Sequence, residues 1–170
     1  MNGSGSGRCV CGAAAPCIDT WHEALAVEQG DPEMYNWHAP LVCTFVLQHR
    51  THMVPRYADG QFRMLQFYAD RGIAATNRLA RHQIARNKDG SGYDLGPLNS
   101  YAALPESGFP AGFPLSVHDL RDADGGFTGD GCRAYGDRMH HLAEATVRAW
   151  LTSRPTSGPR RTRKKLRRQR

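Results

Sequence analysis

Residues 41–49, with the sequence LVCTFVLQH, decide the fold that we predict for this chain of 170 residues. A helix over these residues would be apolar on nearly every side, and helices of that kind are buried in the core. Pro40 disfavours helical geometry in the residue before it, so the helix is expected to run from about Pro40 to His49. We therefore predict that this helix is the most buried element of the domain.

Further helices are predicted on both sides of this core segment. Asp19 or Thr20 can cap a helix that stops at Gly30. The dipeptide Asp31-Pro32 favours the start of another helical element, because Asp is a good cap and Pro suits the first helical position. Beyond residue 59 the apolar spacing predicts two packed helices that are divided at Gly72.

The C-terminal half predicts a long loop and two more helices. Residues 88–115 are rich in Gly and Pro and carry isolated aromatic residues, which favours an ordered loop wrapped on the core. Ser116 and Asp119 form an approximate capping box for a short helix. Apolar residues at helical spacing from Tyr135 to Leu151 predict the last core helix. The predicted class is thus mostly α, a single compact domain of about five to six helices.

Length and composition limit the other possibilities. The chain is long enough for one domain, expected over residues 9–153, and residues 1–8, MNGSGSGR, are expected to be a flexible leader. No run approaches the ~18 apolar residues of a membrane span, and no secretory signal is present. We expect a soluble, cytoplasmic protein with no membrane partner. Five cysteines, an odd number, fit reduced thiols in that compartment.

The positive charge is concentrated at the C-terminus. The chain has a net charge of +6, but residues 160–170, RRTRKKLRRQR, hold eight of the 22 Lys and Arg residues and no acidic one. The remaining residues carry 14 basic and 16 acidic side chains, a balance of −2. Residues 154–170 are predicted to be a disordered basic tail, which either binds nucleic acid without sequence preference or acts as a solubilising extension.

A metal site is the strongest chemical prediction of the sequence. Residues 9–52 contain four of the five cysteines and four of the eight histidines. Cys9, Cys11 and Cys17 lie in CVCGAAAPC, where a turn would let nearby thiolates reach one ion at roughly 2.3 Å. Zinc knuckles usually have two residues between their cysteines, and here there is one. The alternative is that Cys9 and Cys11 are exposed thiols on the leader.

One histidine would complete a site with three thiolates, and His49 is favoured because Gln48 and the buried helix hold it in place. His22, His38 and His52 are the alternates. His38 and His49 lie 11 residues apart, which is ~16 Å along a continuous helix, so both could not bind one ion. The predicted ligands of the zinc ion are therefore Cys9, Cys11, Cys17 and His49.

Other reactive residues receive ordinary interpretations. Cys43 and Cys132 are expected to be small apolar residues, and single histidines elsewhere to be simple imidazoles, namely His118, His140 and His141. The Asp residues between 122 and 130 suggest a calcium loop, but the bidentate Glu at its twelfth position is absent. No phosphate-binding loop, dinucleotide fingerprint or nucleophile elbow is present.

Several of these features together resemble a known family. They are the N-terminal cysteine group, GDPEMY at 30–35, His38, the Gln48-His49 pair, PLSVHDL at 114–120 and Trp150. Over residues 9–152 the chain is similar to a family of small bacterial proteins, common in actinomycetes, that is classed as a domain of unknown function. It departs from that family in its closer cysteine spacing, in lacking an acidic residue near Cys43, and in its basic tail. The resemblance implies a helical domain that can carry a metal site, and it implies no activity.

Three functions follow from these observations. In the first, a small helical protein with a Cys/His zinc site has a structural or accessory role. In the second, a metalloenzyme keeps an open metal position that faces a pocket near residues 35–38 and the 88–115 loop. The third is nucleic-acid association through residues 160–170. The number of protein ligands separates the first two, since four ligands indicate a structural ion and three a catalytic one.

Overall fold

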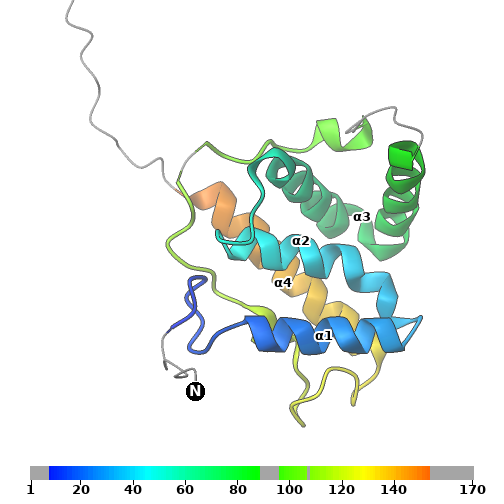
Figure 1. Ribbon diagram of the computed structural model, residues 1–170, viewed down its shortest axis with the longest axis vertical. Coiled ribbons are helices and arrows are strands. Elements are labelled where there is room, and N and C mark those ends of the chain that lie inside the picture. Colours follow the sequence, from blue (N-terminus) through cyan, green and yellow to red (C-terminus); the bar gives the residue numbers. More distant parts are fainter. Residues whose placement is uncertain (1–7, 89–95, 107, 154–170) are drawn as a thin grey trace, which may run out of the picture.

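The computed structural model describes residues 8–88, 96–106 and 108–153. These residues contain four α-helices and three short 3₁₀ helices, and none of them lies in a strand (Figure 1). The fold is mostly α as predicted, although with four α-helices rather than five to six. None of the helices in this described part is long and apolar enough to cross a bilayer. The elements are α1 (Ile18–Gly30), η1 (Met34–Trp37), α2 (His38–Gln48), α3 (Pro55–Lys88), η2 (Gly96–Ser100), η3 (Val117–Leu120) and α4 (Cys132–Thr152).

Helix α2 lies at the centre of the molecule and packs against α1, α3 and α4 (Figure 1). Seven of its 11 residues are buried, which confirms the predicted core helix. The helix begins at His38, two residues earlier than predicted. Pro40 therefore lies in the first turn, where backbone N–H groups have no acceptor within the helix. The N–H that Pro lacks thus costs no helical hydrogen bond. His49 and His38 consequently stand at opposite ends of one straight element.

The predicted pair of helices after residue 59 is confirmed: the stretch labelled α3 consists of two helices that meet at a sharp bend at Gly72. Gly72 has a φ of 71° and a ψ of 178°, which is not helical, and the two halves point in different directions (Figure 1). Only Gly adopts this backbone conformation without strain. The second half of α3 approaches η1 and the start of α2, where Asn77 donates to the side chain of Asn36.

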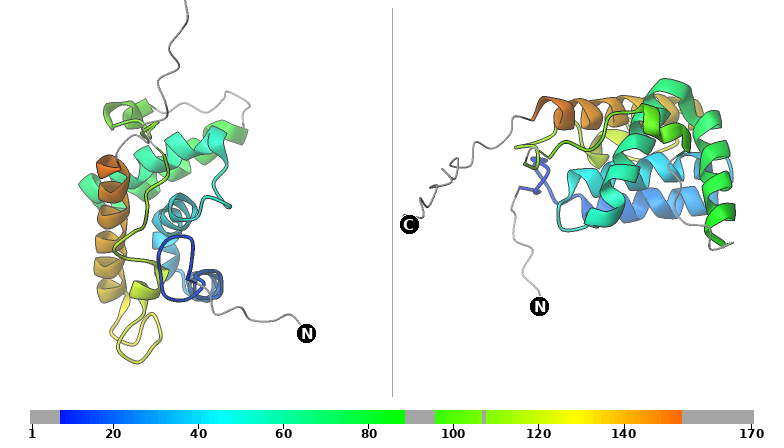
Figure 2. Two further views of the ribbon diagram at one scale, coloured as in Figure 1. Left: turned by 90° about the vertical axis from the view of Figure 1, so that its left-hand side faces the viewer. Right: turned by 90° about the horizontal axis from the view of Figure 1, so that it is seen from above.

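The loop predicted over residues 88–115 is ordered where the structure describes it, and residues 89–95 and 107 lie outside the described ranges. The Arg63 guanidinium of α3 donates to the carbonyls of Leu98 and Tyr101, at 3.3 and 2.7 Å. Farther on, the chain passes beside the N-terminal loop (Figure 2). The side chains of α3 therefore hold this segment against the core. Residues 1–7 of the predicted leader and the predicted tail at 154–170 also lie outside the described part.

Two helix starts test the capping predictions. Ser116 and Asp119 form the predicted capping box, at the start of η3. Helix α1 instead begins at Ile18 with Cys17 at its cap position, and no side chain caps it. The predicted cap Thr20 is buried in the helix, where it hydrogen-bonds to His118. Cys17 is thereby fixed at the first turn of α1.

Candidate metal centre

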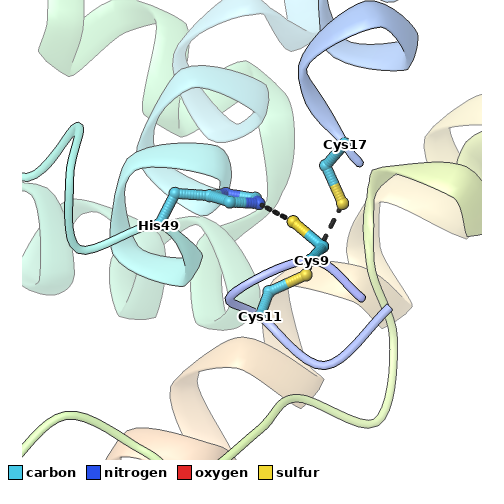
Figure 3. Close-up of side chains that lie close together, drawn as sticks. All are labelled: Cys9, Cys11, Cys17 and His49. Atoms are coloured by element: carbon cyan, nitrogen blue, oxygen red, sulfur yellow. Dashed lines mark hydrogen bonds between the residues drawn. The ribbon is translucent and has the colours of Figure 1, made fainter. Parts of the chain in front are cut away.

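Four side chains converge beside the C-terminal end of α2, as Figure 3 shows. The sulfurs of Cys9, Cys11 and Cys17 and a ring nitrogen of His49 all lie within 4.8 Å of one another. Cys9 Sγ is 3.2 Å from His49 Nε2, and Cys11 Sγ is 3.5 Å from Cys17 Sγ. The structure thus brings together the four residues of the predicted ligand set.

A tight turn explains how Cys9 and Cys11 reach the same point with one residue between them. The Cys9 N–H donates to the Ala13 carbonyl, and the Gly12 N–H donates to the Cys9 carbonyl, both at 2.9 Å. Gly12 has a φ of 98°, in the left-handed region that favours Gly. The chain folds back on itself here, so that both sulfurs face inward. One residue between Cys9 and Cys11 is therefore enough to bring their sulfurs together, without the two-residue spacing of a zinc knuckle.

The turn is held from outside by residues that the sequence did not single out. The Phe113 N–H donates to the Cys11 carbonyl at 2.9 Å. A side-chain carbon on Gly12 would lie 3.7 Å from the Cα atom of Gly112, so two glycines meet at this crossing. The contact joins residues about 100 positions apart, and no local pattern in the sequence signals it.

His118, which we interpreted as an ordinary imidazole, ties this loop to α1. Its Nε2 lies 3.2 Å from the Ala15 carbonyl, and its Nδ1 lies 3.0 Å from the Thr20 hydroxyl. A carbonyl can only accept, so Nε2–H is the donor and Nδ1 accepts from Thr20. The capping box at Ser116 fixes the 3₁₀ turn that carries His118. That box was the only signal in the sequence that could have pointed to this role.

The orientation of His49 suits a metal ligand. Its Nδ1–H donates to the Phe45 carbonyl at 2.7 Å, which leaves the lone pair of Nε2 directed at the sulfurs. Metal-binding histidines usually donate their second ring nitrogen in this way, and the bond fixes both tautomer and ring position. The ring also stacks on Phe45, which in turn stacks on Trp21. This aromatic stack supports His49 from behind.

The cluster is largely closed to solvent, and its contacts favour negative charge on Cys11 in particular. Cys11, Cys17 and His49 are 0, 1 and 4% exposed, and only Cys9 is partly exposed. The S–H of Cys17 lowers the pKa of Cys11 to about 4, against the effect of burial. The same contact, together with burial, raises the pKa of Cys17 far above its usual range. Burial would lower the pKa of His49, but hydrogen bonds with Cys11 and the Phe45 carbonyl outweigh it and raise that pKa.

The donor set and its spacing fit zinc. Three thiolates and one imidazole are a common set of ligands for a tetrahedral structural zinc ion. Ligand sulfurs at roughly 2.3 Å from such an ion would lie about 3.8 Å apart, close to the distance between Cys11 and Cys17. The cluster contains no oxygen ligand of the kind that calcium or magnesium requires.

The three alternate histidines lie elsewhere. His22 is exposed on α1, and His52 is exposed with its ring beside Phe45. The Nδ1 atom of His38 lies 3.2 Å from a carboxylate oxygen of Glu28, at the start of α2. These histidines are therefore outside the cluster.

The two remaining cysteines are also outside it. Cys43 is buried in α2, and burial raises its pKa to about 12. Cys132 is partly exposed at the first position of α4. Both fit the interpretation of ordinary residues, since neither lies with the four grouped side chains.

Two further sequence interpretations can be compared with the structure. A cavity does lie beside residues 35–38, but none of the four cluster residues lines it. The pocket of the metalloenzyme alternative is therefore not at the cluster. In the loop after η3, the carboxylate of Asp122 accepts from the N–H groups of Gly126 and Gly129, both at 2.8 Å. Asp122 thus stabilises its own loop.

These observations define the class of protein: a small, mostly α-helical domain with a closed Cys₃His cluster. The chain belongs to the family of unknown function DUF5946, whose model matches residues 6–151. This match confirms the resemblance drawn from the sequence. No curated protein and no solved structure matches the chain.

Proposed function

We propose that the protein is a zinc-stabilised helical domain in which Cys9, Cys11, Cys17 and His49 hold one zinc ion. The observation that carries the proposal is the convergence of four donor atoms within 4.8 Å from three separate parts of the chain. Three of these side chains, Cys11, Cys17 and His49, are almost fully buried, and within the described part of the chain their closest polar contacts are to one another, to Cys9 and to the Phe45 carbonyl. Buried groups of this kind are costly unless a partner compensates them.

The ion would have a structural role. Four protein ligands complete a tetrahedral zinc site and leave no position for a substrate or an activated water. The ligands join the N-terminal loop, the first turn of α1 and the end of α2, which lie apart in sequence. Binding would therefore hold the loop onto the core helix. Reduced thiolate ligands also fit a reducing compartment such as the cytoplasm, which remains part of this proposal.

Metal analysis of the full chain, purified without an affinity tag, tests the proposal. We expect one zinc ion per chain, and X-ray absorption should count three sulfur ligands and one nitrogen ligand. Cys17→Ser should lose the metal and melt at a lower temperature, because structural zinc binding is coupled to folding. Cys132→Ser is the matched control, since Cys132 lies outside the cluster, and should keep both metal and stability. Metal-free protein whose melting is indifferent to a chelator would contradict the proposal.

A further inference from the structure

A second group of buried polar side chains lies at the opposite end of α2. Glu28 of α1 is 0% exposed, and one of its carboxylate oxygens lies 3.2 Å from Nδ1 of His38. The hydroxyl of Tyr135 in α4 donates to the other oxygen at 3.3 Å. A glutamate this deeply buried is destabilising unless it is well paired, and such residues concentrate at functional sites.

The contact with Glu28 orients the ring of His38. Burial raises the pKa of Glu28, although His38 and Tyr135 act in the other direction. A protonated carboxyl group would donate to Nδ1 of His38, and the neutral ring would then carry its N–H on Nε2. His38 would in that form offer a hydrogen-bond donor on the part of its ring that does not face Glu28.

A cavity of about 190 Å³ lies beside this ring and is lined by residues from the start of α2 and the second half of α3. The His38 side chain is 36% exposed and lines it. Arg81 also lines the cavity, and no side chain among the described residues pairs with its guanidinium. Ala39, the second residue of α2, places the positive end of that helix at the same wall. Among the described residues that line the cavity, none carries a carboxylate.

The rim of the cavity is apolar. Tyr35 stacks on the His38 ring, with 5.1 Å between the ring centroids, and is exposed on its other side. Ile84 of α3 is exposed across from it and lines the same cavity. Large apolar side chains at the mouth of a cavity with convergent polar groups are typical of small-molecule sites.

We propose that this cavity binds a small organic anion, a carboxylate or a phosphate ester with a short apolar body. The Arg81 guanidinium and the Nε2–H of His38 would bind the anionic group, and Tyr35 and Ile84 would contact the body. Glu28 would act as a positioning residue that fixes the ring of His38. The site is independent of the metal cluster, because the two share no residue.

Titrations of the full chain followed by the histidine ring signals in NMR spectra test this site. The probes are benzoate and phenyl phosphate. Benzamide has the shape of benzoate without its charge, and inorganic phosphate lacks the apolar body. The His38 signal is identified by its absence in His38→Gln. We expect saturable shifts with benzoate or phenyl phosphate, and at least about tenfold weaker binding of benzamide and inorganic phosphate. The tighter of the two organic anions identifies the preferred head group.

A matched pair of variants separates the site from general charge effects. Arg81→Gln should weaken binding of the organic anion by about tenfold or more. Arg78→Gln removes the same charge three residues earlier on α3, where the side chain lines a different cavity, and should leave binding unchanged. Circular dichroism verifies that both variants fold. The proposal is overturned if no probe gives a saturable shift, if benzamide binds as well as benzoate, or if both Arg variants have equal effects.

Discussion

The two ends of α2 carry histidines with contrasting surroundings. At the C-terminal end, His49 donates Nδ1–H to a carbonyl of its own helix and faces three thiols in a closed site. At the N-terminal end, His38 faces a buried carboxylate on one side and an open cavity on the other. The same residue type is thus fixed by an oxygen atom in both places. What differs is the rest of the surroundings, since His49 meets the sulfurs through Nε2 and His38 lines a cavity.

The same substitution at both ends should have very different effects. His49→Gln removes the nitrogen ligand, so zinc should be lost and the free energy of unfolding should fall by roughly 5 kcal/mol or more. His38→Gln keeps a hydrogen-bond donor for Glu28 and should retain the metal with a much smaller loss. Metal content and thermal denaturation of the two variants measure this contrast. A chelator should lower the stability of the wild type and of His38→Gln, but not that of His49→Gln. If the chelator affected both variants equally, the two histidines would not differ in their role.

The core of α2 should contribute nearly as much as the metal. Phe45 is buried, stacks on both Trp21 and His49, and provides the carbonyl that orients His49. Phe45→Ala should cost about 3–5 kcal/mol, because truncating a fully buried Phe leaves a cavity. Chemical denaturation of the metal-loaded variant gives this value. A change below about 1 kcal/mol would mean that the helix is peripheral.

The sequence was informative where the signal was local. The apolar run at 41–49 predicted the core helix, and the crowding of cysteines predicted that Cys9, Cys11 and Cys17 lie together with His49. Gly72 likewise marked the division between the two helical halves of α3, where the backbone is not helical.

Contacts between distant segments could not be predicted. Glu28 looks like any polar residue of an exposed helix, and its carboxylate meets His38 of α2 and Tyr135 of α4 only in the folded chain. The crossing of Gly12 and Gly112 and the contact of His118 with Ala15 depend in the same way on tertiary packing. A single sequence has no local pattern that records such pairings.

The carboxylate at the N-terminal end of α2 should make stability depend on pH. Burial raises the pKa of Glu28, so this group stabilises the folded state below its ordinary pKa of 4.5, and that contribution is lost as the pH rises through the folded pKa. Glu28→Gln removes the titration and keeps the shape. The stability of the variant relative to wild type should therefore increase as the pH rises from 4 towards neutral, by about 1.4 kcal/mol for each unit of the shift.

Denaturation curves of the wild type and Glu28→Gln at several pH values measure this difference. Glu144→Gln is a control, because Glu144 is a partly exposed carboxylate on α4 that lies outside both sites. The difference in stability between Glu144→Gln and the wild type should change little as the pH rises from 4 towards neutral. A wild type that instead gains stability over Glu28→Gln as the pH rises would mean that the carboxylate is stabilised by its partners rather than penalised by burial.

The smallest effect on either end of α2 should come from removing the basic C-terminus. A chain that ends at Ser153 should keep its metal, its melting temperature and any anion binding, since all the residues of both sites precede that position.

Residues 160–170 hold eight basic residues and no aromatic one, a composition that binds phosphate backbones through counterion release without reading bases. Titrations against duplex DNA and single-stranded RNA at two salt concentrations should show weak binding by the full chain, in the range of ~10⁻⁴ to 10⁻⁶ M, that falls steeply with salt. The shortened chain should bind neither, because residues 1–153 carry 13 basic and 16 acidic side chains, a balance of −3. Equal binding by both chains would exclude the C-terminal residues as the cause, and a preference for one sequence would mean that the folded domain contacts bases.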